Sequence, residues 1–154
     1  MTSPLRLCVR RSPALDAGGV ATLVTLRLPS EVGCIEEAVE LVTRHCLAGH
    51  ETCPQTRFRL RVVLSEALSN AVVRGNREDC RKWVDIRAEL HAELIRLVVT
   101  DEGCGFDPAS VPDPILPDRL ARADGRGLYL ILKLVDSVQF NEQGNSICMT
   151  LRRL

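Results

Sequence analysis

The sequence predicts an α+β fold, a two-layer sandwich in which several helices cover one face of a mixed, mainly antiparallel sheet. The 154 residues are 45% hydrophobic and 26% charged, the balance of a globular protein with a single core. The predicted elements run in the order strand, helix, helix, strand, strand, short helix, helix, strand, strand. This order favours a sheet with helices gathered on one side.

The beginning of the chain is expected to be an arm followed by the first strand. Residues 1–17 are poorly specified and lead into the turn sequence Asp-Ala-Gly-Gly of residues 16–19. We therefore expect the folded domain to span residues 18–154. Val20–Leu28 contains alternating β-branched residues, which predict a strand.

Two helices are predicted next. Ser30 is the expected N-cap of a helix over 31–48, with apolar residues at helical spacing and Gly49 at its end. Pro54 suits the first turn of a second helix, which continues to about Arg74.

The second half of the chain is predicted to return mainly to strands. Residues 83–90 and 94–100 have strand patterns and a short turn between them, which predicts a hairpin. A proline-rich loop is expected over 106–117. The remaining predicted elements are a short helix at 118–123, a helix at 126–134, and strands at 135–141 and 147–153 joined by a turn at 142–145.

Charge and cysteine content disfavour several classes of function. The 20 basic and 20 acidic side chains give no net charge, which disfavours direct binding of nucleic acid. Arg10, Arg11 and Asp16 interrupt any apolar core of a signal peptide, and no apolar stretch approaches the length of a membrane span. Seven cysteines, an odd number without a C-x-x-C pair, favour reduced thiols. We expect a cytoplasmic protein without a membrane contact.

A cluster of possible zinc ligands is the main alternative site. His45, Cys46, His50 and Cys53 lie close together in the sequence. They straddle a predicted helix end and a turn, and their spacing matches no common zinc site. Buried or half-buried thiols with a surface histidine pair are the favoured interpretation.

The first motif is the segment L-S-E-A-L-S-N-A-V-V-R-G-N of residues 64–76. Glu66 and Asn70 are four residues apart, so both lie on one face of the predicted second helix. Alone, such a pair is more often part of a solvent-exposed polar face.

The second and third motifs each combine glycines with an element end. Asp101 follows a predicted strand, where its carboxylate can accept a hydrogen bond from a ligand amino group, and Gly103 and Gly105 allow close approach of the backbone. Gly125 and Gly127 open a predicted helix, where free N–H groups and the helix dipole favour phosphate.

In this order and spacing, the three segments resemble the N, G1 and G2 boxes of the GHKL ATPases, which share the Bergerat ATP-binding fold. The closing G-N-S-I-C-M-T-L resembles the last strand of that fold. The resemblance extends from about residue 20 to the end. The E-A-x-x-N-A-x-x-x-G pattern and the F-D-P…P…G-R-G-L run are most similar to those of RsbW-type anti-sigma factors, which are serine kinases of bacterial partner-switching systems.

This resemblance implies a role for each matching residue. Glu66 matches the catalytic base that takes the proton from the attacking hydroxyl. Asn70 matches the ligand that binds Mg²⁺ through its amide oxygen, a hard ligand for a hard ion. Asp101 matches the carboxylate that reads the amino group of adenine, in a pocket shaped by Gly103 and Gly105.

The third box implies contacts to the phosphates. Gly125, Gly127 and Leu128 match the G-x-G-L turn of the family. The arginine that often precedes this turn is displaced here, because Arg122 lies one position further out and Arg126 lies between the glycines. Which of the two meets the γ-phosphate is open.

Two other positions depart from the family pattern. Arg74 stands where many members have histidine, and Asn145 stands where a threonine near the adenine is common. The effect of Arg74 on catalysis is open, while Asn145 can still supply a polar contact.

The resemblance implies a kinase that binds ATP and Mg²⁺. It would phosphorylate a serine or threonine of a small anti-sigma factor antagonist, sequester a sigma factor, and form a homodimer. The alternative is a non-catalytic ATP-binding module that captures a protein partner. A detached histidine-kinase catalytic domain is disfavoured by the short, proline-rich segment 106–117.

Overall fold

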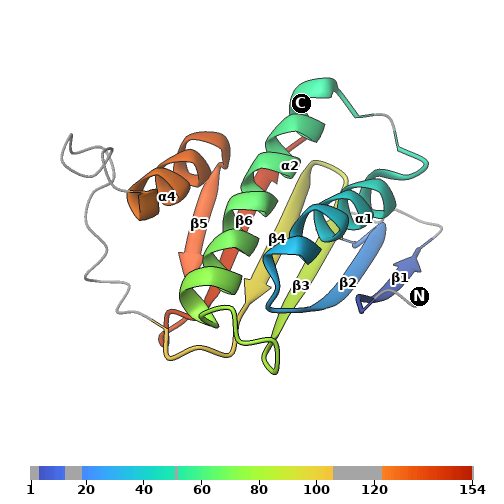
Figure 1. Cartoon of the computed structure of the whole chain (residues 1–154). Helices are drawn as coiled ribbons and strands as arrows, with labels where there is room; N and C mark the ends of the chain where they lie inside the picture. The colour runs from blue at the N-terminus through green and yellow to red at the C-terminus, as the bar shows by residue number, and fades with distance from the viewer. Residues whose placement is uncertain (1–3, 13–18, 51, 106–122, 154) are drawn as a thin grey trace.

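The computed structural model describes residues 4–12, 19–50, 52–105 and 123–153, and these form two layers (Figure 1). One layer is a six-stranded sheet in the order β1-β2-β3-β4-β6-β5. Helices α1, α2 and α4 lie together on one face of this sheet (Figure 1). The elements are β1 (Arg6–Arg11), β2 (Thr22–Pro29), a 3₁₀ turn (Val32–Cys34), α1 (Ile35–Leu47), α2 (Pro54–Ser69), a π-helical turn (Asn70–Gly75), β3 (Trp83–Leu90), β4 (Leu94–Thr100), α4 (Ala123–Leu134), β5 (Ser137–Phe140) and β6 (Ser146–Arg152). The predicted two-layer α+β sandwich is confirmed.

The pairing of the strands places the ends of two of them side by side. Every pair of neighbouring strands in the described residues is antiparallel. β6 lies between β4 and β5, and Thr100 at the end of β4 is opposite Ser146 at the start of β6. Asp101 and Asn145 therefore leave the sheet next to each other, and the backbone N–H of Asp101 donates to the Asn145 carbonyl over 2.9 Å.

The core lies between the sheet and the helices. Alternate residues of the central strands point toward the helices, as the period of two in a strand requires. The largest fully buried side chains are Leu26, Leu28, Leu60, Leu64, Leu68, Leu90, Ile95, Leu97, Ile131, Met149, Leu151 and Val24. Among the described residues, no helix combines the length and apolar character needed to cross a bilayer.

The structure contains one strand that the sequence analysis did not predict. Residues 1–17 were expected to form an arm, but Arg6–Arg11 forms the edge strand β1 and pairs with β2 along its whole length. Five of its six side chains are exposed, so the segment lacks the apolar alternation that marks a half-buried strand. Backbone pairing with β2 and partial packing of Val9 against the core hold it. The expected turn at 16–19 lies mostly outside the described residues.

The predicted N-cap at Ser30 is wrong. A 3₁₀ turn precedes α1, and neither start has a side-chain cap. The Ser30 hydroxyl instead donates to the Lys82 carbonyl over 2.8 Å and accepts from Asn76 Nδ2 over 2.7 Å. A tertiary contact therefore uses the group that local sequence assigned to the helix. Gly49 does follow the end of α1, with φ of +79°.

Two elements near the C-terminus begin at other residues than predicted. α4 begins at Ala123, so its first turn includes residues expected to precede it, and β5 begins at Ser137, two residues later than predicted. The loop predicted at 106–117 lies outside the described residues, as do residues 118–122 of the short helix predicted at 118–123, whose last residue, Ala123, is the first residue of α4.

Candidate functional site

The site begins at the end of α2, where Glu66 lies on the same face as Asn70, the first residue of the π-helical turn. Pro54 occupies the first turn of this helix, and the Cys53 thiol caps it by accepting from the Thr56 N–H over 3.4 Å. At Asn70 the helix widens into a π-turn, in which the Asn76 N–H reaches the Ala71 carbonyl over 2.8 Å.

Asp101 is held at the end of β4 from two directions. The Gly103 N–H donates to Asp101 Oδ1 over 2.7 Å, and Asn145 Nδ2 donates to the Asp101 carbonyl over 3.2 Å. Burial raises the pKa of the Asp101 carboxyl, while the Gly103 amide and the charge of Lys82 oppose that rise. Within the described residues, no group donates to Oδ2, so this oxygen is available to an outside donor.

Glycine is required where the π-turn meets the loop after β4. A Cβ at Gly75 would overlap the Asp101 carboxylate, and a Cβ at Gly103 would overlap the Gly75 carbonyl. Gly105 has φ of +75°, and a Cβ there would overlap the Gln143 carbonyl. The close approach that Gly103 and Gly105 permit is therefore to the protein's own backbone, which closes one end of the site.

A cavity of about 510 Å³ opens in front of these groups, a size that suits a small ligand. It contains five of the residues predicted for the site, namely Asn70, Asp101, Gly103, Gly105 and Leu128. Among the described residues that line it are three cations, Arg74, Arg77 and Lys82, and one carboxylate, that of Asp101. This charge balance favours an anionic ligand.

Glu66 and Gly127 meet beside this cavity. A Cβ built on Gly127, which is buried in α4, would lie 2.9 Å from Glu66 Oε2 and 3.5 Å from Asn70 Oδ1. The backbone of α4 thus rests directly on the polar pair of α2. Gly125 lies in the first turn of the same helix.

Two predicted arginines are not placed. Arg122 lies outside the described residues, and the side chain of Arg126 is not described. The two departures from the family pattern, Arg74 and Asn145, both line the cavity.

Asn76 is a residue that the sequence analysis did not assign to the site. It is fully buried, and its Nδ2 donates to Ser30 Oγ over 2.7 Å and to the Trp83 carbonyl over 3.0 Å. Its Oδ1 accepts from the Glu102 N–H over 2.8 Å. An Asn after Gly at a helix end is typical of a surface cap, so nothing local reveals this burial.

The two thiols of the alternative zinc cluster, Cys46 and Cys53, lie in different surroundings. Cys46 is fully buried in the core, and burial raises the pKa of its thiol to about 12. Cys53 is the N-cap of α2. Within the described part of the chain, no three His, Cys, Asp or Glu side chains are grouped to hold a metal ion.

Comparisons with known proteins agree with this geometry. The profile of a family described as the histidine kinase-like ATPase domain matches residues 28–151. The chain is 33% identical over 99 residues to the serine-protein kinase RsbW of Bacillus subtilis (strain 168), which covers 59% of this chain and 61% of that relative. It is 33% identical over 98 residues to the protein of the same name from Staphylococcus aureus (strain JH9), with 58% and 62% covered. The chain thus spans about three fifths of the length of these relatives.

Proposed function

The chain belongs to the histidine kinase-like ATPase domain family, and from this premise we propose that it is an ATP- and Mg²⁺-dependent serine/threonine-protein kinase that acts as an anti-sigma factor. One observation carries the proposal. The cavity that holds Asp101 at one end reaches Asn70 at the other, where Glu66 and Gly127 also meet.

The base end of the nucleotide is assigned to Asp101. Its available Oδ2 accepts a hydrogen bond from the amino group of adenine, and Asn145 and Gly103 fix its orientation. A half-buried carboxylate held in this way selects an amino group over a carbonyl, because a carbonyl would leave it facing another acceptor.

The phosphate end is assigned to the start of α4. Gly127 lies against Glu66 and Asn70, Leu128 lines the cavity, and Gly125 lies in the first turn of the same helix, where backbone N–H groups favour phosphate.

The oxygen donors present fit Mg²⁺. Asn70 Oδ1 and Glu66 Oε2 both lie within reach of the Gly127 backbone, and Mg²⁺ commonly takes one or two protein oxygens with its remaining ligands from phosphate and water. Asn70 would hold the ion, which when bound neutralises charge on the phosphates. Glu66 would accept the proton of the attacking serine or threonine hydroxyl.

The protein partners are proposed from the relatives. Two relatives carry the name serine-protein kinase. From the resemblance of the motifs to RsbW-type anti-sigma factors, we propose a small anti-sigma factor antagonist as the phosphate acceptor. The second proposed partner is a sigma factor, held when the antagonist is phosphorylated.

The experiment separates turnover from binding. Glu66→Gln keeps the shape and hydrogen bonding of the side chain but removes its basic carboxylate. We expect single-turnover transfer of phosphate from ATP to the antagonist to fall by about 10²–10⁴-fold, the usual contribution of a general base. ATP affinity, measured in parallel by calorimetry, should change little, whereas Asn70→Ala should reduce Mg²⁺-dependent binding and transfer together.

Transfer at the wild-type rate by Glu66→Gln would contradict the assigned base. A wild-type protein that binds ATP but transfers no phosphate would support the alternative function, a binding module that captures its partner without turnover.

A further inference from the structure

One face of α2 meets α4 at two separate points. Arg59, Glu66 and Asn70 are spaced seven and four residues apart, which places them on the same side of the helix. Gly127 of α4 lies against Glu66 and Asn70, and the Leu134 carbonyl at the end of α4 accepts from Arg59 Nε over 2.7 Å.

The two contact points have matched spacing. Arg59 of α2 contacts Leu134 of α4, and Glu66 of α2 contacts Gly127 of α4. The contacts thus follow one another in opposite directions along the two helices. Seven residues separate the points on each helix, about 10 Å at 1.5 Å per residue. The helices are therefore antiparallel here.

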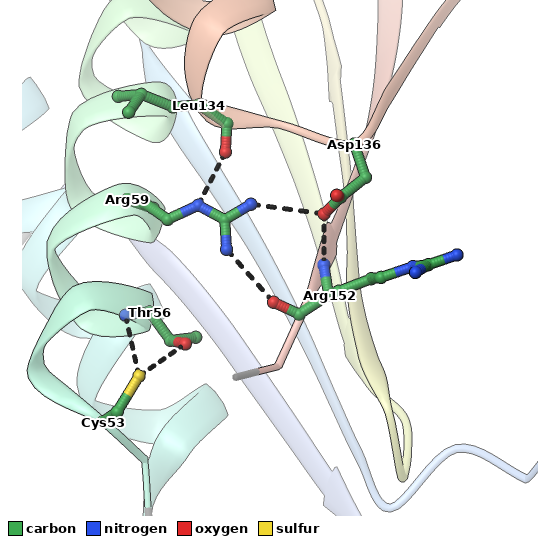
Figure 2. A network of polar contacts seen from close by, with 6 residues as sticks. All are labelled: Cys53, Thr56, Arg59, Leu134, Asp136 and Arg152. Carbon is green, nitrogen blue, oxygen red and sulfur yellow. Dashed lines mark hydrogen bonds and ion pairs between the residues drawn. The ribbon is translucent and has the colours of Figure 1, made fainter.

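Arg59 joins three segments through one guanidinium group (Figure 2). Besides Leu134, its two terminal nitrogens donate to the Arg152 carbonyl and to Asp136 Oδ2, each over 3.2 Å. Asp136 Oδ2 also accepts from the Arg152 N–H over 2.6 Å. That backbone bond and the Arg59 guanidinium hold the pKa of the Asp136 carboxyl below its ordinary value.

The Arg59 guanidinium group is held in place by its burial and by its three acceptors. The Arg59 side chain is only 16% exposed, and its planar fork meets three acceptors at once. The Leu134 carbonyl belongs to the last turn of α4, where carbonyls lack partners inside the helix. Arg59 thus binds the end of α4, the residue that precedes β5, and the end of β6.

We propose that Arg59 is a positioning residue that sets the axial register of α4 on α2, and thereby the place of Gly127 over Glu66 and Asn70. The inference rests on the proposed function, because it concerns the phosphate end of that site. A Cβ at Gly127 would lie 2.9 Å from Glu66 Oε2, so even a methyl group there would require the Glu66 carboxylate to move. A slip of α4 by one residue, about 1.5 Å, would therefore alter this contact.

Arg61 provides a matched control on the same helix. It carries the same charge two residues away, and its ion pair with Glu40, at 2.6 Å, joins side chains that are 38% and 51% exposed. Exposed pairs of this kind contribute little to stability. Arg61→Met and Arg59→Met therefore remove the same charge, and the second also removes the contact to α4.

Affinities for two ligands test the inference. Calorimetry would compare ATP with Mg²⁺ against adenosine for the wild type, Arg59→Met, Arg59→Lys and Arg61→Met. We expect Arg59→Met to weaken binding of ATP with Mg²⁺ by about tenfold, the lower end of the effect of outer-shell residues that orient metal ligands. Adenosine affinity should not change, since α4 does not hold Asp101. Arg59→Lys should lie between the wild type and Arg59→Met, and Arg61→Met should match the wild type.

Hydrogen exchange provides a readout that needs no nucleotide. Without ligand, Arg59→Met should raise the exchange of the amides of residues 127–134, and Arg61→Met should not. Equal losses for ATP and adenosine, no loss for either, or equal exchange in the two variants would overturn the inference. A wild type that binds neither ligand would contradict the proposed function, and the exchange data would still decide the role of Arg59.

Discussion

At the scale of single residues, Asp101 shows how ligand recognition and stability oppose each other. A carboxylate that reads an amino group must be partly removed from water, and that burial raises the pKa of its carboxyl. In the folded protein the ionised form is therefore less favoured than in the unfolded chain. Gly103 and Lys82 offset only part of this cost.

Asp101→Asn should separate the two effects. Loss of the charged acceptor should weaken ATP binding by about 1.5–3 kcal/mol, measured by calorimetry. Because the folded pKa is raised, the carboxyl destabilises the native state increasingly as pH rises above its ordinary value of 3.8. The nucleotide-free variant should thus have a Tm at pH 7 equal to or above that of the wild type, and the difference should shrink below about pH 4.

The control for this substitution is Asp85→Asn. Asp85 is exposed and pairs with Arg27 on β2 at 3.2 Å, away from the cavity. It should leave ATP affinity unchanged. Wild-type ATP affinity in Asp101→Asn would contradict the assignment of the base end.

At the scale of elements, Asn76 joins four segments of the chain. Its side-chain amide links the π-turn after α2 to the end of β2 through Ser30, to the start of β3 through Trp83, and to the loop after β4 through Glu102. Trp83 and Glu102 are also joined directly, because the Trp83 N–H donates to the Glu102 carboxylate. The loop that carries Asp101 therefore depends on elements far from it in the sequence.

Asn76→Ala should destabilise the protein and loosen this loop. Three hydrogen bonds of a fully buried side chain are lost and the Ser30 hydroxyl, one of their partners, remains buried, so the free energy of unfolding should fall by about 2–4 kcal/mol in urea denaturation. Ser30→Ala removes the hydroxyl but leaves the contacts to Trp83 and Glu102, and it should cost about 1 kcal/mol. Equal losses in the two variants would show that Asn76 does not have this joining role.

At the scale of the whole molecule, the site lies where elements from both layers end. β4 and β6 contribute Asp101 and Asn145, and the helix layer contributes the π-turn of α2 and the glycines of α4 (Figure 1). A ligand in the cavity would contact both layers at once. Ligand binding should therefore stabilise the entire fold.

Thermal denaturation tests this linkage and the role of metal together. ATP with Mg²⁺ at about 100 times its Kd should add roughly 2.7 kcal/mol, which is a rise in Tm of about 5–11 °C for a domain of this size. EDTA should abolish much of that rise but leave the Tm of the nucleotide-free protein unchanged. A large drop in the Tm of the nucleotide-free protein on addition of EDTA, with zinc found by elemental analysis, would indicate a structural metal. It would contradict our interpretation of His45, Cys46, His50 and Cys53.

Patterns of residues close together in the sequence were sufficient to predict most of the strands and helices. The bounds predicted for β3 and β4 agree with the structure, because alternating side chains and a short turn are properties of adjacent residues. The face shared by Glu66 and Asn70 likewise follows from helical periodicity alone. Asp101 and its glycines could be singled out because they come directly after a predicted strand.

Contacts between distant residues decided the rest. β1 is a strand because the edge of β2 offers backbone partners, although its own side chains are largely exposed. Ser30 and Asn76, 46 positions apart, bond to each other, so Ser30 does not cap α1. Arg59 reaches Leu134 across 75 positions. Periodicity and turn chemistry describe neighbours along the chain, whereas a hydrogen bond between buried groups depends on where the folded backbone brings them, and only the tertiary structure determines that.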